Sequence, residues 1–324
     1  PAPDKGEGIT PPAGKEENSI IGIPLTVKGD IYGVLLAQES GVDPNFRERR
    51  LEIMNGIAQQ TALAIQNDRL NQEMVERERL EQEIQVARDI QRTFLPSKLP
   101  ATPGWDLDIS WQPARQVGGD FYDAFRLPHK RLGVLIADVS DKGMPAALYM
   151  TVARTLLRAT ALEEYSPARV LARVNNLLLM DSHYGMFITC FYAIVSLNDG
   201  VVTYANSGHN IPFIVRAEAG LVQRLEKGGM AMAVLKNEQT VDHTLTVNPG
   251  DMLLLYTDGV TEAFSPNNEL FGEDQLLQTV QAHAAASAQG MIAAIHHNVV
   301  EFTQGAQPSD DITLLALKRN LPKT

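Results

Sequence analysis

The sequence predicts an α+β fold in which antiparallel sheets are flanked by helices, preceded by one long helix. Strand-like and helix-like segments after residue 104 come in blocks, without regular βαβ alternation, which favours antiparallel sheets. The turn Asn198-Asp199-Gly200 joins two of these strands as a hairpin. Residues 45–95 contain no proline and a single glycine, so we expect them to form the long helix.

Four segments are expected along the 324 residues. Residues 1–18 are rich in proline, glycine and charge and are expected to be a disordered lead-in. Residues 19–68 hold two strand-like runs, a turn and the first part of the long helix. Residues 69–103 continue that helix as a linker until prolines end it, and residues 104–320 form the main domain.

The linker helix is highly charged but keeps a narrow apolar stripe. Its members are Leu70, Met74, Leu80, Ile84, Ala87 and Ile90. Such a stripe suits a coiled-coil seam, and a solvated helix of this length needs a partner. We therefore expect a homodimer through this helix. Packing of the helix against its own domain is the alternative.

The main domain contains seven strand-like runs and four helical patterns. The strands are expected at 107–111, 133–138, 187–197, 201–205, 211–215, 251–256 and 312–317. The helices are expected at 145–162, 167–180, 273–286 and 290–302, with proline in a favoured first-turn position in two of them. With 44% apolar residues, the chain has ample material for a buried core.

Charge and composition restrict the classes of function. The formal net charge of −11 disfavours nucleic acid or an anionic membrane surface as the main partner. No apolar run approaches the roughly 20 residues needed to span a bilayer. The single cysteine, Cys190, excludes an internal disulfide and a cysteine-rich zinc site, so a cytoplasmic location is expected. Its apolar neighbours predict an inert core thiol.

Four acidic motifs stand where predicted strands end. They are Gly118-Gly119-Asp120-Phe121-Tyr122-Asp123, Ala137-Asp138-Val139-Ser140-Asp141-Lys142-Gly143, Tyr256-Thr257-Asp258-Gly259 and Ser309-Asp310-Asp311-Ile312-Thr313. Each motif alone is also typical of an ordinary turn. Asp138 and Asp258 follow strongly apolar strands, where an unpaired charge is costly. Because Lys and Arg are sparse around the motifs, bound Mg²⁺ or Mn²⁺ is the economical explanation.

These motifs resemble those of the metal-dependent serine/threonine phosphatases of the PPM (phosphatase 2C-like) type, in the bacterial stage II sporulation E (SpoIIE)/RsbU branch. The matching stretches are PARQVGGDFYDAF, GVLIADVSDKGMPAALYM, FITCFYAIV, VTYANSGHNIPF, DMLLLYTDGVTEA, FGEDQL and SDDITLLALK. The resemblance covers residues 84–320 and implies an αββα sandwich with a two-metal centre between its sheets. Asp141 departs from the family pattern DVSGKG and adds a negative charge near the metal ions.

Carried over position by position, the resemblance assigns metal ligands. Asp138 would bridge both metal ions, and the Val139 carbonyl would coordinate one of them. Asp258 and Asp310 would hold the second metal ion. Asp120 would lie beside the first, bound directly or through water.

Further side chains are candidates for supporting roles. Whether Asp310 or Asp311 faces the metal is left open, with the family register favouring Asp310, and Asp123 lies near the ligands in sequence. Arg115 precedes the Gly-Gly-Asp motif and could bind the substrate phosphate as a bidentate fork, unless it is a solvated loop arginine. His209 could protonate the leaving serine oxygen or hydrogen-bond a neighbouring turn.

The predicted chemistry is hydrolysis of a phosphoserine or phosphothreonine monoester. Two metal ions about 3.5 to 4 Å apart lower the pKa of a bridging water and clamp the phosphate for in-line attack. The resemblance implies that the substrate is a STAS-type anti-anti-sigma factor in a bacterial stress or developmental switch. The choice between Mn²⁺ and Mg²⁺ stays open.

Other classes of protein fit less well. An aspartyl-nucleophile phosphatase needs an aspartate where Tyr256 stands. A nucleotide cyclase built on the Gly-Gly-Asp hairpin needs further nucleotide motifs, which the sequence lacks. A non-catalytic regulator that keeps the phosphatase fold is the remaining alternative. The presence of Asp120, Asp138, Asp258 and Asp310 argues against it.

Residues 19–68 resemble the last third of a GAF sensor domain, with two closing strands and a terminal helix. A sensory pocket cannot form from this segment alone, so no sensory ligand can be inferred. Either this sequence cuts through such a domain, or the missing part lies upstream in the native protein.

Overall fold

The structure is a computed structural model that describes residues 19–39, 47–181, 185–218 and 220–322. The expected lead-in, residues 1–18, lies outside the described residues. Contacts divide the chain into two compact units, residues 1–83 and 84–324. Helix α1, Arg47–Phe94, runs from the first unit into the second. None of the described helices is long and apolar enough to cross a membrane.

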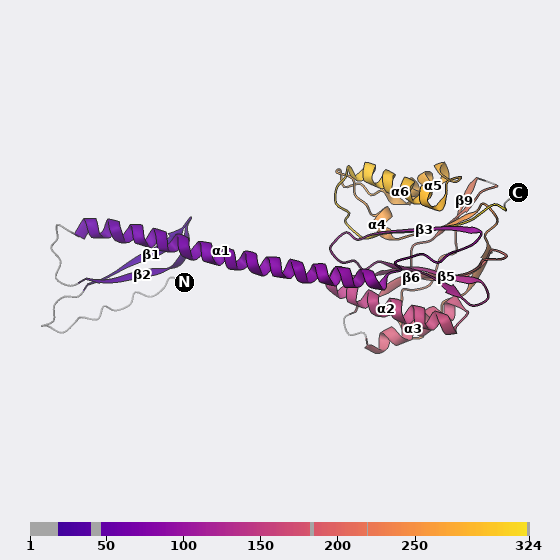
Figure 1. Cartoon of the computed structure of the whole chain (residues 1–324), viewed down its shortest axis with the longest axis horizontal. Helices are drawn as coiled ribbons and strands as arrows, with labels where there is room; N and C mark the ends of the chain where they lie inside the picture. The colour runs from indigo at the N-terminus through magenta and orange to yellow at the C-terminus, as the bar shows by residue number, and fades with distance from the viewer. Residues whose placement is uncertain (1–18, 40–46, 182–184, 219, 323–324) are drawn as a thin grey trace. The chain divides into compact units, whose positions relative to one another are not determined.

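The first unit is a β-hairpin packed on the amino-terminal half of α1 (Figure 1). Strands β1, Ser19–Val27, and β2, Asp30–Glu39, pair antiparallel. Lys28 and Gly29 make the turn with φ angles of 51° and 99°. Positive φ at both positions matches the right-handed twist of hairpin strands. The sequence predicted the two strands and a turn between them.

The two faces of this hairpin differ in burial. One face packs on α1 through a small core of Ile23, Leu25, Ala58 and Ala62. Ile21, Val27, Tyr32 and Leu35 are partly buried against this core. Other apolar side chains of the two strands are exposed. Four of them are more than half exposed, namely Ile20, Ile31, Val34 and Leu36.

The second unit contains two five-stranded antiparallel sheets. The first has the spatial order β10 (His243–Thr246), β7 (Val201–Ser207), β6 (Ile188–Ser196), β5 (Arg131–Val139) and β4 (Phe121–Leu127). The second has the order β3 (Trp105–Gln112), β12 (Ile312–Arg319), β11 (Met252–Tyr256), β8 (Phe213–Arg216) and β9 (Leu221–Arg224). Alternate residues of both sheets, such as Phe191, Leu255 and Leu315, fill the space between them.

Helices cover the outer face of each sheet, as Figure 1 shows. Helices α2 (Met144–Glu163) and α3 (Pro167–Asp181) pack on the first sheet. Helices α5 (Gly272–Ala282) and α6 (Ala288–Thr303) pack on the second, beside the one-turn helix α4 (Asp258–Thr261). Two sheets with helices confirm the predicted α+β class, whereas the GAF-like segment and the coiled coil stay predictions.

Strand β4 was not predicted, because charged residues interrupt its apolar pattern. Asp123, in the middle of β4, is fully buried. Its Oδ2 lies 2.7 Å from Arg154 Nη2 and 3.0 Å from Arg158 Nη1, both on α2. These ion pairs compensate the buried charge and tie α2 to β4. The contacts described here give Asp123 a role in packing, and its expected support of the metal ligands stays a prediction.

Candidate active site

Antiparallel pairing brings the acidic motifs together in each sheet. In the first sheet, Asp120 just before β4 lies beside Asp138 near the end of β5, because β4 and β5 are antiparallel neighbours. In the second sheet, Asp258 after β11 lies beside Asp310 and Asp311 before β12, for the same reason. In each sheet, one motif precedes its strand and the other lies at the end of the neighbouring antiparallel strand. Strand pairing therefore brings the two motifs to the same edge of the sheet.

Hydrogen bonds between the sheets join these two halves. Asp120 is 1% exposed, and its Oδ2 accepts hydrogen bonds from the hydroxyls of Thr257 (2.7 Å) and Thr313 (2.6 Å). Both threonines belong to the second sheet or its edge, whereas Asp120 leads into the first. The sequence analysis did not single them out. The sequence feature that could have identified these threonines is a hydroxyl residue close to an aspartate at the border of a strongly apolar strand.

Asp311 holds the loop that leads to Asp120. Its Oδ1 accepts the backbone N–H of Ala114 at 2.8 Å, and its Oδ2 accepts those of Gly119 at 2.7 Å and Asp120 at 3.3 Å. A Cβ at Gly118 would clash with the same carboxylate, so only glycine fits there. Because Asp311 is committed to backbone groups, the neighbouring Asp310 is the better candidate for a metal ligand.

Asp310 is paired with a lysine from another motif. The Nζ of Lys142 lies 2.6 Å from Asp310 Oδ2 and donates a hydrogen bond to the carbonyl of Ser309 at 2.9 Å. Lys142 stands just before α2, on the side of the first sheet, so the pair links the two halves of the sandwich. The sequence analysis expected few cations around the motifs and did not foresee that Lys142 pairs with Asp310.

Burial and mutual repulsion raise the pKa values of the clustered carboxyl groups. Burial first, and then the charge of Asp258, raise the pKa of Asp138 to about 7. Burial and the charge of Asp310 raise the pKa of Asp258 to about 6, against a smaller lowering by Lys142. The pKa of Asp120 is raised well above its usual value, mainly by burial and then by Asp138. The negative charge of the cluster is therefore incompletely compensated.

The donor set suits Mg²⁺ or Mn²⁺. Carboxylates and the Val139 carbonyl are hard oxygen donors, and a divalent cation would relieve the repulsion between Asp138 and Asp258. Within the described ranges, no group of three or more His, Cys, Asp or Glu residues is placed so that it could hold a metal ion as it stands. Asp120 faces threonine hydroxyls and Asp310 faces Lys142, so a metal ion would have to draw both carboxylates from these partners.

His209 lies in the interior of the second unit, an environment that favours a structural role over the predicted protonation of a leaving group. It is 5% exposed, and its Nδ1 lies 2.8 Å from Thr189 Oγ1. Its backbone N–H donates to Asn206 Oδ1 at 2.8 Å, and its carbonyl accepts from the Asn206 amide. Burial lowers the pKa of His209 to about 3, so the ring is neutral at pH 7. The residue stabilises the turn after β7, which was the alternative considered.

Arg115 is accessible to solvent near the acidic cluster's supporting loop. Arg115 is exposed on the loop between β3 and β4, next to Ala114, whose N–H is bound by Asp311. Asp311 therefore also positions the segment that carries Arg115.

Cys190 is fully buried in β6, and burial raises the pKa of its thiol, as expected of an inert core residue.

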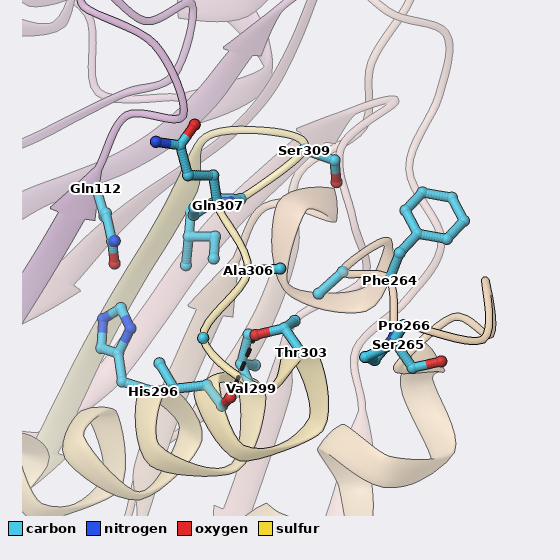
Figure 2. Close-up of a pocket in the computed structure, with 15 residues that line it drawn as sticks. Gln112, Phe264, Ser265, Pro266, His296, Val299, Thr303, Ala306, Gln307 and Ser309 are labelled. Atoms are coloured by element: carbon cyan, nitrogen blue, oxygen red, sulfur yellow. Dashed lines mark hydrogen bonds between the residues drawn. The ribbon is translucent and has the colours of Figure 1, made fainter.

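A pocket of about 420 Å³ lies beside the loop that leads into Asp310 (Figure 2). Figure 2 shows His296 and Gln112 on one side and Phe264 on the other, with Gln307 and Ser309 on the loop above α6. No carboxylate of the acidic cluster lines this pocket. It is therefore a side pocket and is separate from the candidate metal site.

Comparisons with known proteins place this chain in one family. The family model for stage II sporulation protein E (SpoIIE) matches residues 128–320. The chain is 33% identical to Protein IcfG of Synechocystis sp., over 74% of this chain and 42% of that protein. It is 31% identical to the phosphoserine phosphatase RsbU of Bacillus subtilis, over 75% of this chain and 71% of that protein.

Solved structures agree with the sequence relatives. The PP2C domain of SiaA from Pseudomonas aeruginosa superposes with a TM-score of 0.66 at 20% identity, covering 75% of this chain and 98% of that one. The RsbU and RsbW domains of a Mycobacterium tuberculosis protein give a TM-score of 0.60 at 26% identity, covering 71% and 64%. The chain therefore belongs to the SpoIIE family of PP2C-type protein phosphatases.

Proposed function

We propose that this chain removes phosphate from phosphoserine or phosphothreonine on a regulatory protein with the help of two divalent metal ions. The supporting observation is the convergence of Asp120, Asp138, Asp258 and Asp310 from both sheets, with charges that raise one another's pKa values. These four residues and the Val139 carbonyl are the proposed ligands. Asp138 lies beside Asp120 in the first sheet, and the charges of Asp258 and Asp310 from the second sheet raise its pKa, so it is the proposed bridging ligand.

The remaining residues have distinct proposed tasks. Bound divalent metal supplies an activated water and neutralises the charge of the phosphate. Thr257 and Thr313 hold the buried Asp120 in place through its Oδ2. Asp311 fixes the loop that presents Arg115, and the guanidinium of Arg115 can take two phosphate oxygens as a bidentate donor.

The proposed substrate is a phosphorylated STAS-type anti-anti-sigma factor. The similarity to RsbU, which is named a phosphoserine phosphatase, supports phosphoserine as the group removed, and the STAS-type protein is the partner that the family resemblance implies. The magnesium complex of the structural neighbour RsbX supports Mg²⁺ as one usable ion, with Mn²⁺ as the other candidate. That neighbour is 16% identical with a TM-score of 0.51, so it supports the fold and not the substrate.

We also propose that α1 joins two copies of the chain in a coiled coil. Leu70, Met74, Leu80 and Ile90 are each about half exposed on α1. Their spacing fits a seam that a second helix would cover. Leu80→Lys combined with Ile84→Lys places like charges in the seam. This variant should be a monomer by light scattering, whereas a dimer of unchanged mass would contradict the coiled coil.

Metal dependence and substrate are tested with the full chain on two compounds, a phosphorylated STAS protein and a small aryl phosphate. We expect hydrolysis of both with Mn²⁺ or Mg²⁺ and loss of both with a chelator. Unchanged turnover in chelator would refute the metal mechanism. Hydrolysis of the aryl phosphate without hydrolysis of the protein would refute the substrate. A folded chain that binds the phosphoprotein but hydrolyses neither compound with metal present would be the non-catalytic regulator.

A further inference from the structure

Lys142 is held in a defined orientation by the backbone around it. Asp141 has a φ of 82° and Gly143 a φ of 81°, so the chain turns sharply on both sides of the lysine. The N–H of Lys142 donates to Asp141 Oδ1 at 2.8 Å. The side chain then reaches the loop before β12 on the opposite half of the sandwich.

The ammonium group of Lys142 lies where two proposed metal ligands meet. It contacts Asp310 Oδ2 and the Ser309 carbonyl, and its charge also acts on Asp258. Asp258 and Asp310 are the residues assigned to the second metal ion. Asp120 is instead satisfied by hydroxyl groups, so the lysine contact is specific to the second position.

We infer that Lys142 is a built-in counter-ion that competes with the second metal ion for Asp310. The inference rests on the proposed two-metal function. Asp310 Oδ1 already accepts the backbone N–H of Asp311 at 2.9 Å, so Oδ2 is the oxygen for which a metal ion and Lys142 compete. Two cations on that one oxygen repel each other strongly. A metal ion that binds Asp310 therefore displaces the ammonium group, and the ion pair lowers the apparent affinity for the metal.

The test is calorimetric titration of the full chain with Mn²⁺ in the absence of substrate. Lys142→Met removes the charge while keeping most of the side-chain volume. Because the pair is partly exposed, at 42% for Lys142 and 28% for Asp310, we expect Mn²⁺ to bind about fivefold more tightly. Lys142→Arg keeps the charge and should bind Mn²⁺ as the unaltered chain does.

Lys130→Met is the matched control for net charge. Lys130 is exposed and lies just before β5, at the end of that strand opposite Asp138. It should leave the affinity for Mn²⁺ unchanged. Unchanged or weaker Mn²⁺ binding by a folded Lys142→Met variant would overturn the inference, as would equal tightening by Lys130→Met. If the unaltered chain binds no Mn²⁺, the proposed two-metal function itself fails, which is a separate result.

Discussion

The two units of this chain bury their apolar side chains to different degrees. In the sandwich, both faces of each sheet are covered, and Leu253 has no exposed surface between the sheets. In the hairpin unit, one face packs on α1 while Leu36 on the other face is 69% exposed. The contrast indicates that the sandwich carries its own stability and supports the acidic cluster. The hairpin has one apolar face that water still reaches.

If catalysis belongs to the sandwich alone, Asp138→Asn should change activity most. We expect kcat for an aryl phosphate to fall on the order of 10²–10³-fold, since one charged group of the reaction centre is lost. The fold should be kept or gain stability, because burial and Asp258 already disfavour the charge of Asp138. Asp30→Asn, in the exposed hairpin turn, is the control and should leave kcat unchanged. Near-normal turnover in Asp138→Asn would remove this residue from the centre.

A matched pair of leucine truncations tests the difference in burial directly. Leu253→Ala in the sandwich should lower the free energy of unfolding by about 2–5 kcal/mol, because it leaves a cavity between the sheets. Leu36→Ala on the open hairpin face should cost less than about 0.5 kcal/mol. Denaturant unfolding of both variants measures these values. A large cost at Leu36 would mean that this hairpin face is covered in solution.

The buried histidine predicts a response of the sandwich to acid. Folded His209 stays neutral down to about pH 3, whereas the unfolded chain takes up its proton near pH 6.5. The unfolded state binds more protons between these values, so this residue lowers stability as the pH falls. Its contribution is about 2 kcal/mol between pH 7 and pH 5.

His209→Gln should remove that pH-dependent part, as measured by urea unfolding at the two pH values. Carboxyl groups with raised pKa values, such as Asp138, change stability in the opposite sense over this range. The quantity to compare is therefore the difference between variant and unaltered chain. His297→Gln is the exposed control and should preserve the unaltered response. An identical response in both variants would contradict the assignment to His209.

The mildest change is expected at Asp141, within the sandwich but at its surface. Asp141 has a φ of 82°, a backbone conformation that glycine adopts without a steric penalty. Asp141→Gly relieves the backbone strain, which should raise the free energy of unfolding by about 1 kcal/mol. Loss of the hydrogen bond from the Lys142 N–H offsets part of this gain, so we expect a small net increase. Asp199→Gly, in a turn without positive φ at that residue, should lower stability instead. Equal losses in both variants would show that Asp141 is not strained.

Two of the four acidic motifs could be found from sequence because each ends a strongly apolar run. Asp138 and Asp258 stand at the ends of buried strands, where a charge is conspicuous. The different environments of Asp310 and Asp311 could not be read in the same way. Asp311 is bound to Ala114, 197 residues away in sequence, and no local pattern reports a contact of that range.

Sequence analysis also failed where the partner of a charged residue lies far away in the sequence. Strand β4 was missed because Asp123 interrupts its apolar pattern, and Arg154 and Arg158 on α2 compensate the buried charge of that residue. Lys142 was visible within its motif, but its partner Asp310 lies on the other half of the sandwich. In both cases the decisive fact was a neighbour brought by tertiary structure.

The last turns of α1 carry a buried amide that fixes the rotation of the helix about its own axis. Gln91 is 4% exposed, and its side chain uses both ends on one residue, donating to the Gly118 carbonyl at 2.6 Å and accepting from the Gly118 N–H at 3.3 Å. Gly118 lies two residues before Asp120. A shift of α1 by one residue would turn this side chain by about 100° and break both bonds. The two hydrogen bonds therefore allow one rotational setting of the end of α1, and that setting is defined by the backbone of the Gly-Gly-Asp loop.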